Sequence, residues 1–383
     1  LYSPEDFGHY AIYFLSVSIL GSIGSLSLQN AIFLPDNDAS AVDLCITSII
    51  TGGLICTLFS LLILLNGNYL ADLFLGQEVL KNIYVLIGSL YFVTCYACLY
   101  SLALKKGIYS VLTRNKLILS VTLALVQIAI GLTSGSGKGL MLANLIGVIL
   151  SVVLIVPSVW KELKESAIRY KLQTLYLHLR KNLHFIIYTA PATLVNSLAS
   201  SGPEIVIKLV FGAGAVGHYS LANRMLSAPL NFVSGAIQDI FKERAASEGT
   251  LTGNYRNTFN VFFSLMLVAS ILLVVPIAIF APTIFKFIFG LQWEESGYIT
   301  QSLAFLVIIR FVSSPLSYIW ILRKRQREDF IWQIGLLIIT FLSLGFSYFT
   351  KSGLGLRDIV LLYSVSAGLW YFLCLCLSSK YAR

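Results

Sequence analysis

The chain alternates between long apolar stretches and short polar loops. About eleven of the apolar stretches are roughly 20 residues long, the length of a helix that crosses the hydrocarbon core of a bilayer. Unbroken apolar runs such as 261–280 exclude a membrane β-barrel, whose strands would alternate apolar and polar residues. We therefore predict an all-α polytopic membrane protein with spans at residues 10–33, 43–65, 79–104, 115–132, 139–159, 183–210, 219–241, 257–279, 297–322, 330–349 and 358–378.

Basic residues are distributed unevenly between the two sets of alternate loops. The poorer set holds Lys81, Lys138, Lys208, Lys286, Lys351 and Arg357. Because cytoplasmic loops carry the excess of Lys and Arg, the richer set is predicted to be cytoplasmic, with the C-terminus inside. The richer set comprises Lys105, Lys106, Arg114, Lys116, Lys161, Lys164, Arg169, Lys171, Arg180, Lys181, Lys242, Arg244, Arg256, Arg323, Lys324, Arg325, Arg327, Lys380 and Arg383.

Composition agrees with this interpretation. Of the 383 residues, 57% are hydrophobic and 12% are charged, whereas about a quarter of a soluble domain is charged. The formal net charge of +9 lies in particular loops rather than on one face, which is typical of membrane topology and not of nucleic-acid binding. Nucleic acid is therefore excluded as a partner.

The second half of the chain repeats the first. Gly-His-Tyr at residues 8–10 recurs at 217–219, and later segments, including residues 74–77 and 289–292, match in the same order. The repeat contains an even number of crossings, so we predict two six-helix lobes of the same orientation. The span 183–210 has no counterpart before residue 1, so we expect the parent protein to carry a further helix that the first lobe lacks here.

These boundaries divide the chain into an N-terminal lobe at residues 1–159, a cytoplasmic linker at 160–182 and a C-terminal lobe at 183–383. The linker predicts an amphipathic helix that lies on the anionic inner leaflet, because its apolar positions alternate with Lys and Arg. Those positions are Leu163, Ala167, Tyr170, Leu172, Leu175 and Leu179.

Neither the cysteines nor the glycine-rich turn indicates a cofactor or a metal. The six cysteines fall in or beside apolar spans, where they are interpreted as small apolar residues packed between helices. The turn at residues 134–139 resembles a phosphate-binding loop superficially. That loop needs Gly and Ser or Thr at positions that Leu132 and Gly139 occupy here.

Arg310 lies near the middle of the predicted span 297–322. A charged side chain at that depth costs about 2.5–3.5 kcal/mol on insertion scales, and it is too far from either interface to reach one. Two interpretations remain open. Arg310 lines a water-filled cavity that attracts an anionic group of a substrate, or it is held by a structural partner.

Arg224 and Glu204 flank the short extracytoplasmic turn near Gly214, on the two legs of a predicted helical hairpin. Residues equally distant from the turn lie at equal depth, so they can form an ion pair for which Lys208 competes. The alternatives are a structural or gating ion pair and a direct contact with substrate or a cation. Asp239 lies beside other charges at a cytoplasmic helix end, where interface solvation explains it, with a gating role as the other interpretation.

Two motifs carry a resemblance to a known family. Residues 1–10 read Leu-Tyr-Ser-Pro-Glu-Asp-Phe-Gly-His-Tyr, and residues 216–222 read Val-Gly-His-Tyr-Ser-Leu-Ala after Phe-Gly at 211–212, with Arg224 and Pro229 beyond. The chain resembles the multidrug/oligosaccharidyl-lipid/polysaccharide exporter superfamily, and within it the Wzx-type polysaccharide (O-antigen) flippases. The resemblance runs over essentially the whole chain.

The resemblance implies a MATE-like fold in a bacterial inner membrane, with two lobes that alternate between inward- and outward-facing states. It implies an undecaprenyl-pyrophosphate-linked oligosaccharide as cargo, moved to the periplasmic leaflet for O-antigen or another surface polysaccharide. Arg310 and Arg224 would bind the pyrophosphate. Membrane lipids, a polysaccharide polymerase and a chain-length regulator are the further partners implied.

Two rival functions differ in the residues they require. A cation-coupled multidrug exporter of the same fold needs buried carboxylates for cationic drugs, and Glu204 is the convincing candidate. A membrane enzyme such as a polymerase needs catalytic residues on a sizeable extramembrane loop. The outer loops here are short, with one acidic pair at residues 294–295, so we predict a transporter rather than an enzyme.

Overall fold

The computed structural model describes residues 2–35, 37–70, 76–133, 137–252, 254–323, 325–346 and 353–382. Every regular element in these ranges is a helix, as the apolar pattern predicts. The helices form two compact units, Leu1–Ser201 and Gly202–Arg383, which are described one at a time. The lobe and linker boundaries read from the sequence stay a prediction.

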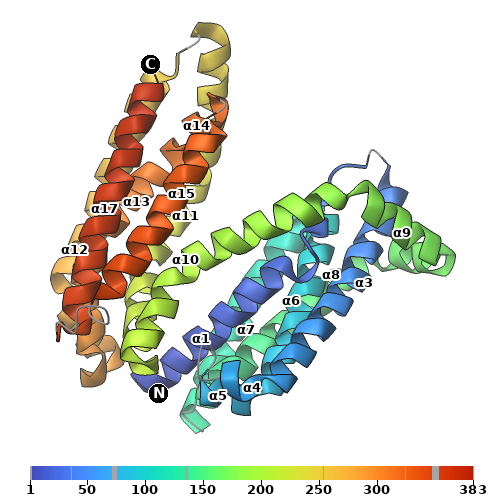
Figure 1. Ribbon diagram of the computed structural model, residues 1–383, viewed down its shortest axis with the longest axis horizontal. Helices are drawn as coiled ribbons and strands as arrows, with labels where there is room; N and C mark the ends of the chain where they lie inside the picture. Colours follow the sequence, from blue (N-terminus) through green and yellow to red (C-terminus); the bar gives the residue numbers. More distant parts are fainter. Residues whose placement is uncertain are drawn as a thin grey trace. The chain divides into compact units, whose positions relative to one another are not determined.

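In unit 1, α6 is the central helix. It packs against α1, α3 and α8, while α7 packs against α8 (Figure 1). The elements in chain order are α1 (Pro4–Gly24), α2 (Leu28–Ala31), α3 (Asp38–Leu65), α4 (Gly67–Leu70), α5 (Gln77–Lys81), α6 (Ile83–Lys105), α7 (Tyr109–Thr133), α8 (Gly137–Arg169), α9 (Leu172–Lys181), the π-helical turn η2 (Phe185–Thr189) and the first part of α10 (Ala190–Phe211).

In unit 2, α13 holds the corresponding place. It packs against α11, α12 and α17, while α15 packs against α17. The same order of packing partners in both units supports the internal duplication. After the end of α10, the elements are α11 (Ala213–Thr252), α12 (Arg256–Phe289), the 3-10 turn η3 (Leu291–Trp293), α13 (Glu294–Leu316), α14 (Tyr318–Leu322), α15 (Gln326–Leu344) and α17 (Leu356–Tyr381).

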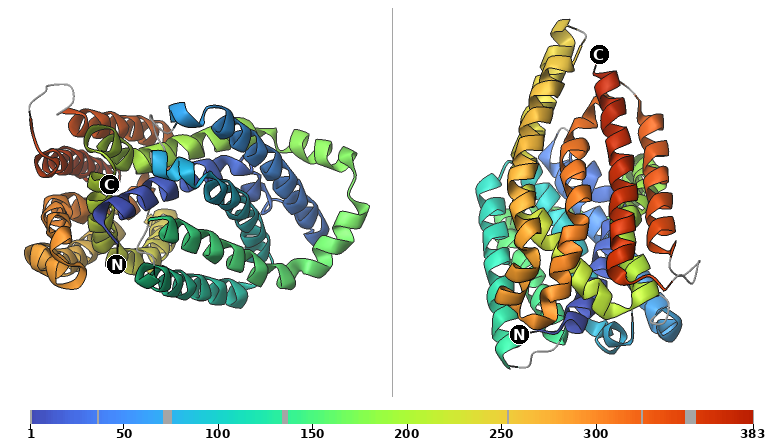
Figure 2. Two further views of the ribbon diagram at one scale, coloured as in Figure 1. Left: turned by 90° about the horizontal axis from the view of Figure 1, so that it is seen from below. Right: turned by 90° about the vertical axis from the view of Figure 1, so that its left-hand side faces the viewer.

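The C-terminal end of unit 2 is tied to the turn between its two longest helices. The Tyr255 amide donates to the Ala382 carbonyl at 2.9 Å, and Arg323 Nε donates to the Tyr381 carbonyl at 2.9 Å. Figure 2 shows the end of α17 and the turn between α11 and α12 at the same end of this unit. These bonds satisfy carbonyls that the last turn of a helix leaves without partners.

The protein is a multi-pass membrane protein. Among the described helices, eight are long and apolar enough to cross a bilayer. The segments Phe185–Leu198 and Ser200–Phe211, which are bent by 48° relative to each other, make a ninth if they form one span. The remaining two predicted spans correspond to α11 and to α15, whose first turn carries Glu328 and Asp329. The count of eleven spans stays a prediction.

The boundaries predicted for the first span, 10–33, were wrong. Helix α1 begins at Pro4, where the Asp6 amide donates to the Ser3 hydroxyl at 3.1 Å, and it ends at Gly24. Leu26 and Ser27 then adopt left-handed φ angles of 52° and 58° before α2 begins. Such angles cost of order 1–3 kcal/mol each, so the break depends on packing that hydropathy does not report.

The predicted amphipathic helix over 160–182 is instead two helices. Helix α8 continues to Arg169, and α9 begins at Leu172. The end of α8 is held within unit 1 by Lys106 Nζ, 2.6 Å from Glu162 Oε1, and by Tyr170, whose hydroxyl lies 2.5 Å from Thr47 Oγ1. These contacts stabilise a turn between the two helices, although the continuous amphipathic pattern of the sequence predicts no turn there.

Gly297 is expected to be essential for the packing of α12 against α13. A Cβ atom there would lie 2.4 Å from Pro282 Cα, which is backbone and has little freedom to move. We expect Gly297→Ala to lower the free energy of unfolding by about 1–3 kcal/mol, seen as a lower Tm of the purified protein. Gly53→Ala is the control, because no atom lies within 4 Å of its added Cβ. Equal melting temperatures for the two variants would contradict this account.

Candidate functional site

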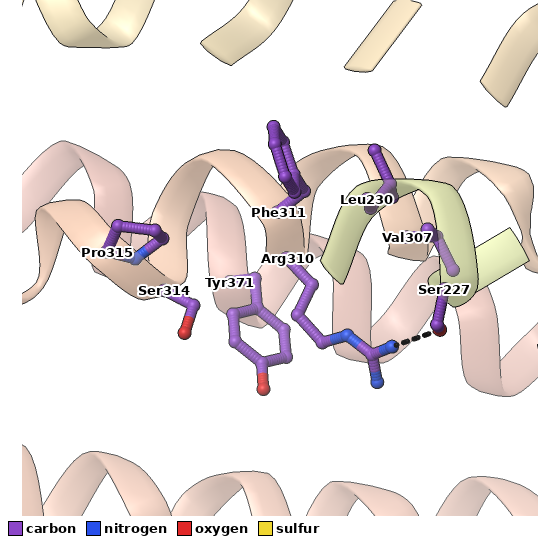
Figure 3. Close-up of a pocket in the computed structure, with 8 residues that line it drawn as sticks. All are labelled: Ser227, Leu230, Val307, Arg310, Phe311, Ser314, Pro315 and Tyr371. Atoms are coloured by element: carbon purple, nitrogen blue, oxygen red, sulfur yellow. Dashed lines mark hydrogen bonds between the residues drawn. The ribbon is translucent and has the colours of Figure 1, made fainter. Parts of the chain in front are cut away.

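Arg310 lies in the C-terminal half of α13 and reaches toward α11. Its Nη2 atom donates a hydrogen bond to Ser227 Oγ at 3.4 Å (Figure 3). The side chain is half-buried inside unit 2. Arg310 is thus partly accessible within this unit, and its role stays a prediction.

Two adjoining pockets share Arg310 and Ser227. The smaller has a volume of about 240 Å³, and the larger, of about 430 Å³, also includes Asn223 and Arg224. The structure thus brings both predicted substrate-binding arginines to one place, from α11 and α13. The remaining lining residues are Leu230, Val307, Phe311, Ser314, Pro315 and Tyr371 in the smaller pocket and Ala228 in the larger.

Helix periodicity explains why these side chains meet. Arg224 and Ser227 are three residues apart on α11, so they lie on one face, and Arg310 and Ser314 are four apart on α13. Pro229 in α11 has no amide hydrogen and leaves the carbonyl one turn earlier without its usual helical donor. The pocket therefore lies beside a helix segment whose backbone hydrogen-bond ladder is interrupted.

The smaller pocket has a polar side and an apolar side. The polar ends of Arg310, Ser314 and Tyr371 point the same way, whereas the ring of Phe311 points the opposite way (Figure 3). Phe311, Leu230 and Val307 are buried in the core of unit 2. The accessible side chains that line the pocket are therefore Ser227, Arg310, Ser314 and Tyr371.

A group of polar side chains surrounds the two arginines. Glu204 on α10 interacts electrostatically with Arg224 and Arg310, and Arg310 also interacts with Tyr371 on α17. Tyr363 on α17 is buried and interacts electrostatically with Arg310 and Glu204. Four helices thus contribute to one electrostatic centre with two cations and one carboxylate.

Of the other predicted residues, Glu204 is half-buried and interacts electrostatically with both arginines. The predicted Arg224–Glu204 ion pair stays a prediction. Lys208 follows one turn later on α10 and is half-buried. Asp239 lies in α11, but its side chain is outside the described part of the chain. The gating roles of these three residues stay predictions.

Sequence reasoning missed the neutral polar residues of the site. Asn223 and Ser227 were detectable, because they adjoin Arg224 at spacings of one and three residues on the same helix. Tyr371 was not, because its contribution depends on how α17 packs against α13. Composition indicates only that aromatic residues are abundant.

Unit 1 has a different interior at the corresponding helices. The Tyr13 hydroxyl of α1 lies 2.5 Å from Ser89 Oγ of α6 and donates to Asn144 Oδ1 of α8 at 3.4 Å. All three residues are buried. This network is neutral, whereas the related helices of unit 2 bring two arginines together.

The sequence matches the model of a family described as polysaccharide biosynthesis protein over residues 1–297. The amylovoran biosynthesis protein AmsL of Erwinia amylovora is 23% identical over 163 residues, which are 43% of this chain and 42% of that relative. The aligned part thus spans less than half of the relative's length.

Solved structures share the fold. An inward closed conformation of the lipid II flippase MurJ matches with a TM-score of 0.75 at 14% identity, over 99% of this chain and 82% of that one. An inward-facing multidrug resistance MATE family transporter of the MOP superfamily matches with a TM-score of 0.69 at 15% identity, over 100% and 93%. The predicted MATE-like fold is confirmed.

Proposed function

The chain belongs to the polysaccharide biosynthesis protein family, and on that premise we propose that it is a flippase for lipid-linked oligosaccharides. Its cargo is an oligosaccharide repeat unit on undecaprenyl pyrophosphate. The protein moves this cargo from the cytoplasmic to the periplasmic leaflet of the bacterial inner membrane by alternating access. The product supplies O-antigen or another surface polysaccharide.

The observation that carries this proposal is the pair of arginines in the larger pocket. A pyrophosphate group is strongly anionic, and planar guanidinium groups bind phosphate oxygens through paired hydrogen bonds. Arg224 and Arg310 line the same pocket, with Asn223 and Ser227 as further donors. The arrangement offers two forks of N–H groups to one diphosphate.

The hydrogen bond that Arg310 makes favours a binding role over a structural one. Its hydrogen bond to Ser227 joins the guanidinium to a neutral hydroxyl at 3.4 Å, which is long for an N–H···O bond. A guanidinium has five N–H donors, so this bond uses little of its capacity. An anionic ligand would gain stronger, charge-assisted bonds.

The aromatic lining of the smaller pocket suits the sugar part of such a cargo. The Tyr371 ring offers a flat surface on which a sugar can stack. Translocation needs no bond to be made or broken, so the protein acts as a transporter and not as an enzyme.

A cation-coupled multidrug exporter is the second candidate. The MATE-like fold and the half-buried Glu204 favour it, since cationic drugs bind buried carboxylates. The charge balance of the site opposes it, because Glu204 faces two arginines. A net positive site attracts anions and repels cationic drugs.

Complementation separates the two candidates. A bacterial strain without its own O-antigen flippase is given the gene, and two phenotypes are measured: surface polysaccharide and resistance to cationic dyes. We expect restored polysaccharide with unchanged dye resistance. Dye resistance without restored polysaccharide, at a verified protein level in the membrane, would support the exporter instead.

The proposed setting includes further proteins and a defined topology. The C-terminus lies in the cytoplasm, and a polysaccharide polymerase and a chain-length regulator act on the cargo after it crosses. The orientation follows from the loops that are richer in Lys and Arg, to which Lys380 at the end of α17 belongs and Arg357 at its start does not. A C-terminal reporter active only in the cytoplasm tests this topology.

A further inference from the structure

Helix α9 has two faces with different environments. One face packs against α3, where Leu175, His178 and Leu179 are half-buried (Figure 1). Burial lowers the pKa of His178, assisted by Lys181 and partly opposed by Asp43. The His178 imidazole is therefore neutral at pH 7 and belongs to the contact with α3.

The opposite face exposes large apolar side chains. Leu172 is 84% exposed, Tyr176 62% and Leu177 61%. Leu172 and Tyr176 are one turn apart and share a face, and Leu177 extends it. The apolar positions that sequence periodicity singles out are thus divided, because Leu175 and Leu179 contact α3 while Leu172 points outward.

Basic residues lie at both ends of this apolar surface. Lys171 precedes it, and Arg180 and Lys181 follow it, all exposed. Helix α9 itself contains no Asp or Glu. We define Lys171, Leu172, Tyr176, Leu177, Arg180 and Lys181 as the α9 surface. It combines exposed apolar side chains, which can insert into a bilayer, with positive charges and no negative charge.

Helix α9 is fixed to unit 1 rather than attached loosely. Tyr170, just before it, lies 2.5 Å from Thr47 of α3 through their hydroxyls. Along α9 itself, the packing against α3 continues this attachment. Both contacts hold the α9 surface at the end of α3 where Asp43 and Thr47 lie, which the distribution of basic residues predicts to be cytoplasmic.

We propose that the α9 surface binds anionic lipid headgroups of the cytoplasmic leaflet and anchors unit 1 at that interface. Leu172 and Leu177 enter the boundary between headgroups and acyl chains, the Tyr176 ring lies at headgroup level, and the basic residues contact lipid phosphates. Charge complementarity identifies the partner, since an all-basic rim around exposed apolar groups matches an anionic bilayer surface. This inference is independent of the cargo.

Limited trypsin digestion of the full chain in nanodiscs tests the proposal. Trypsin cuts after Lys171, Arg180 and Lys181, and the cleavage rate is measured in phosphatidylcholine and in phosphatidylglycerol nanodiscs. We expect cleavage there to be about tenfold or more slower in the anionic discs, while the exposed Arg327 is cut equally in both. The double variant Arg180→Gln, Lys181→Gln should abolish the protection of Lys171 from trypsin. Arg327→Gln is the matched control and should leave that protection unchanged.

Three outcomes would overturn the proposal. Equal cleavage in both lipids would exclude headgroup recognition. If cleavage is equally slow in both lipids and the double variant Leu172→Gln, Leu177→Gln abolishes this protection, the apolar side chains insert without selectivity for lipid charge. Protection in native membrane vesicles but not in phosphatidylglycerol nanodiscs would indicate an acidic protein partner instead. Free phosphate added to phosphatidylcholine discs should give no protection.

Discussion

Arg310→Ala is expected to lower surface-polysaccharide export by about tenfold to a hundredfold, while the protein remains in the membrane at its normal level. The substitution removes the guanidinium that lines both pockets of unit 2. Hydrogen bonds to charged groups contribute about 1.5–3 kcal/mol, and each 1.4 kcal/mol is a factor of ten. Export is measured as polysaccharide per cell, normalised to the amount of protein in the membrane.

Two further variants make this result specific. Arg310→Lys should retain part of the activity, because lysine keeps the charge but loses the planar fork that binds two phosphate oxygens. Arg327→Ala removes an exposed arginine at the start of α15 and should leave export unchanged. Full export by Arg310→Ala at a normal protein level would show that Arg310 has no contact with cargo.

Glu204→Gln is expected to strengthen binding of a pyrophosphate headgroup by about tenfold, because the carboxylate competes with the ligand for Arg224 and Arg310. Glutamine keeps the size of the side chain and removes the negative charge. Affinity is measured with isoprenyl pyrophosphate and the purified protein. We expect slower transport at the same time, since a more tightly held cargo leaves the site less readily.

The control for this prediction is Glu294→Gln. Glu294 lies at the start of α13, 3.7 Å from Lys286 Nζ, and does not line either pocket. Its substitution removes the same charge from the same unit and should leave pyrophosphate affinity unchanged. Weaker binding by Glu204→Gln would mean that the carboxylate orients the arginines for the ligand and does not compete with it.

The fold was predictable because burial in a bilayer imposes long apolar helices. The predicted spans begin within five residues of the starts of α3, α6, α8 and α12, although α8 and α12 each extend ten residues beyond the predicted ends. The prediction failed at Leu26 and Ser27, where tertiary packing determines the backbone conformation. Gly24 lies so close to Thr94 of α6 that a Cβ would be 2.3 Å from its hydroxyl oxygen. That close approach is a tertiary contact, and it cannot be predicted from the hydropathy of the sequence.

The site was predictable residue by residue but not as an arrangement. Arg310 and Arg224 are conspicuous because charge inside a span is costly. Their meeting depends on the packing of α11 against α13, so the sequence treated them separately and paired Arg224 with Glu204 alone. Tyr363 and Tyr371 resemble many other aromatic residues of the spans and carry no local signal.

The difference between the halves was also partly visible in the sequence. The matched segments place Arg310 opposite residues 92–95, none of which is charged. The two halves therefore share their helix packing, whereas only the second half carries an arginine at this position. In unit 1 the comparable interior relies on the neutral contact of Tyr13 with Ser89.

Native mass spectrometry of the purified protein with an undecaprenyl-pyrophosphate-linked oligosaccharide tests the central claim most directly. The account predicts that the unsubstituted chain retains one bound lipid and that the Arg224→Ala, Arg310→Ala double variant retains almost none, with both proteins equally folded. Equal retention of the lipid by the two proteins would contradict it.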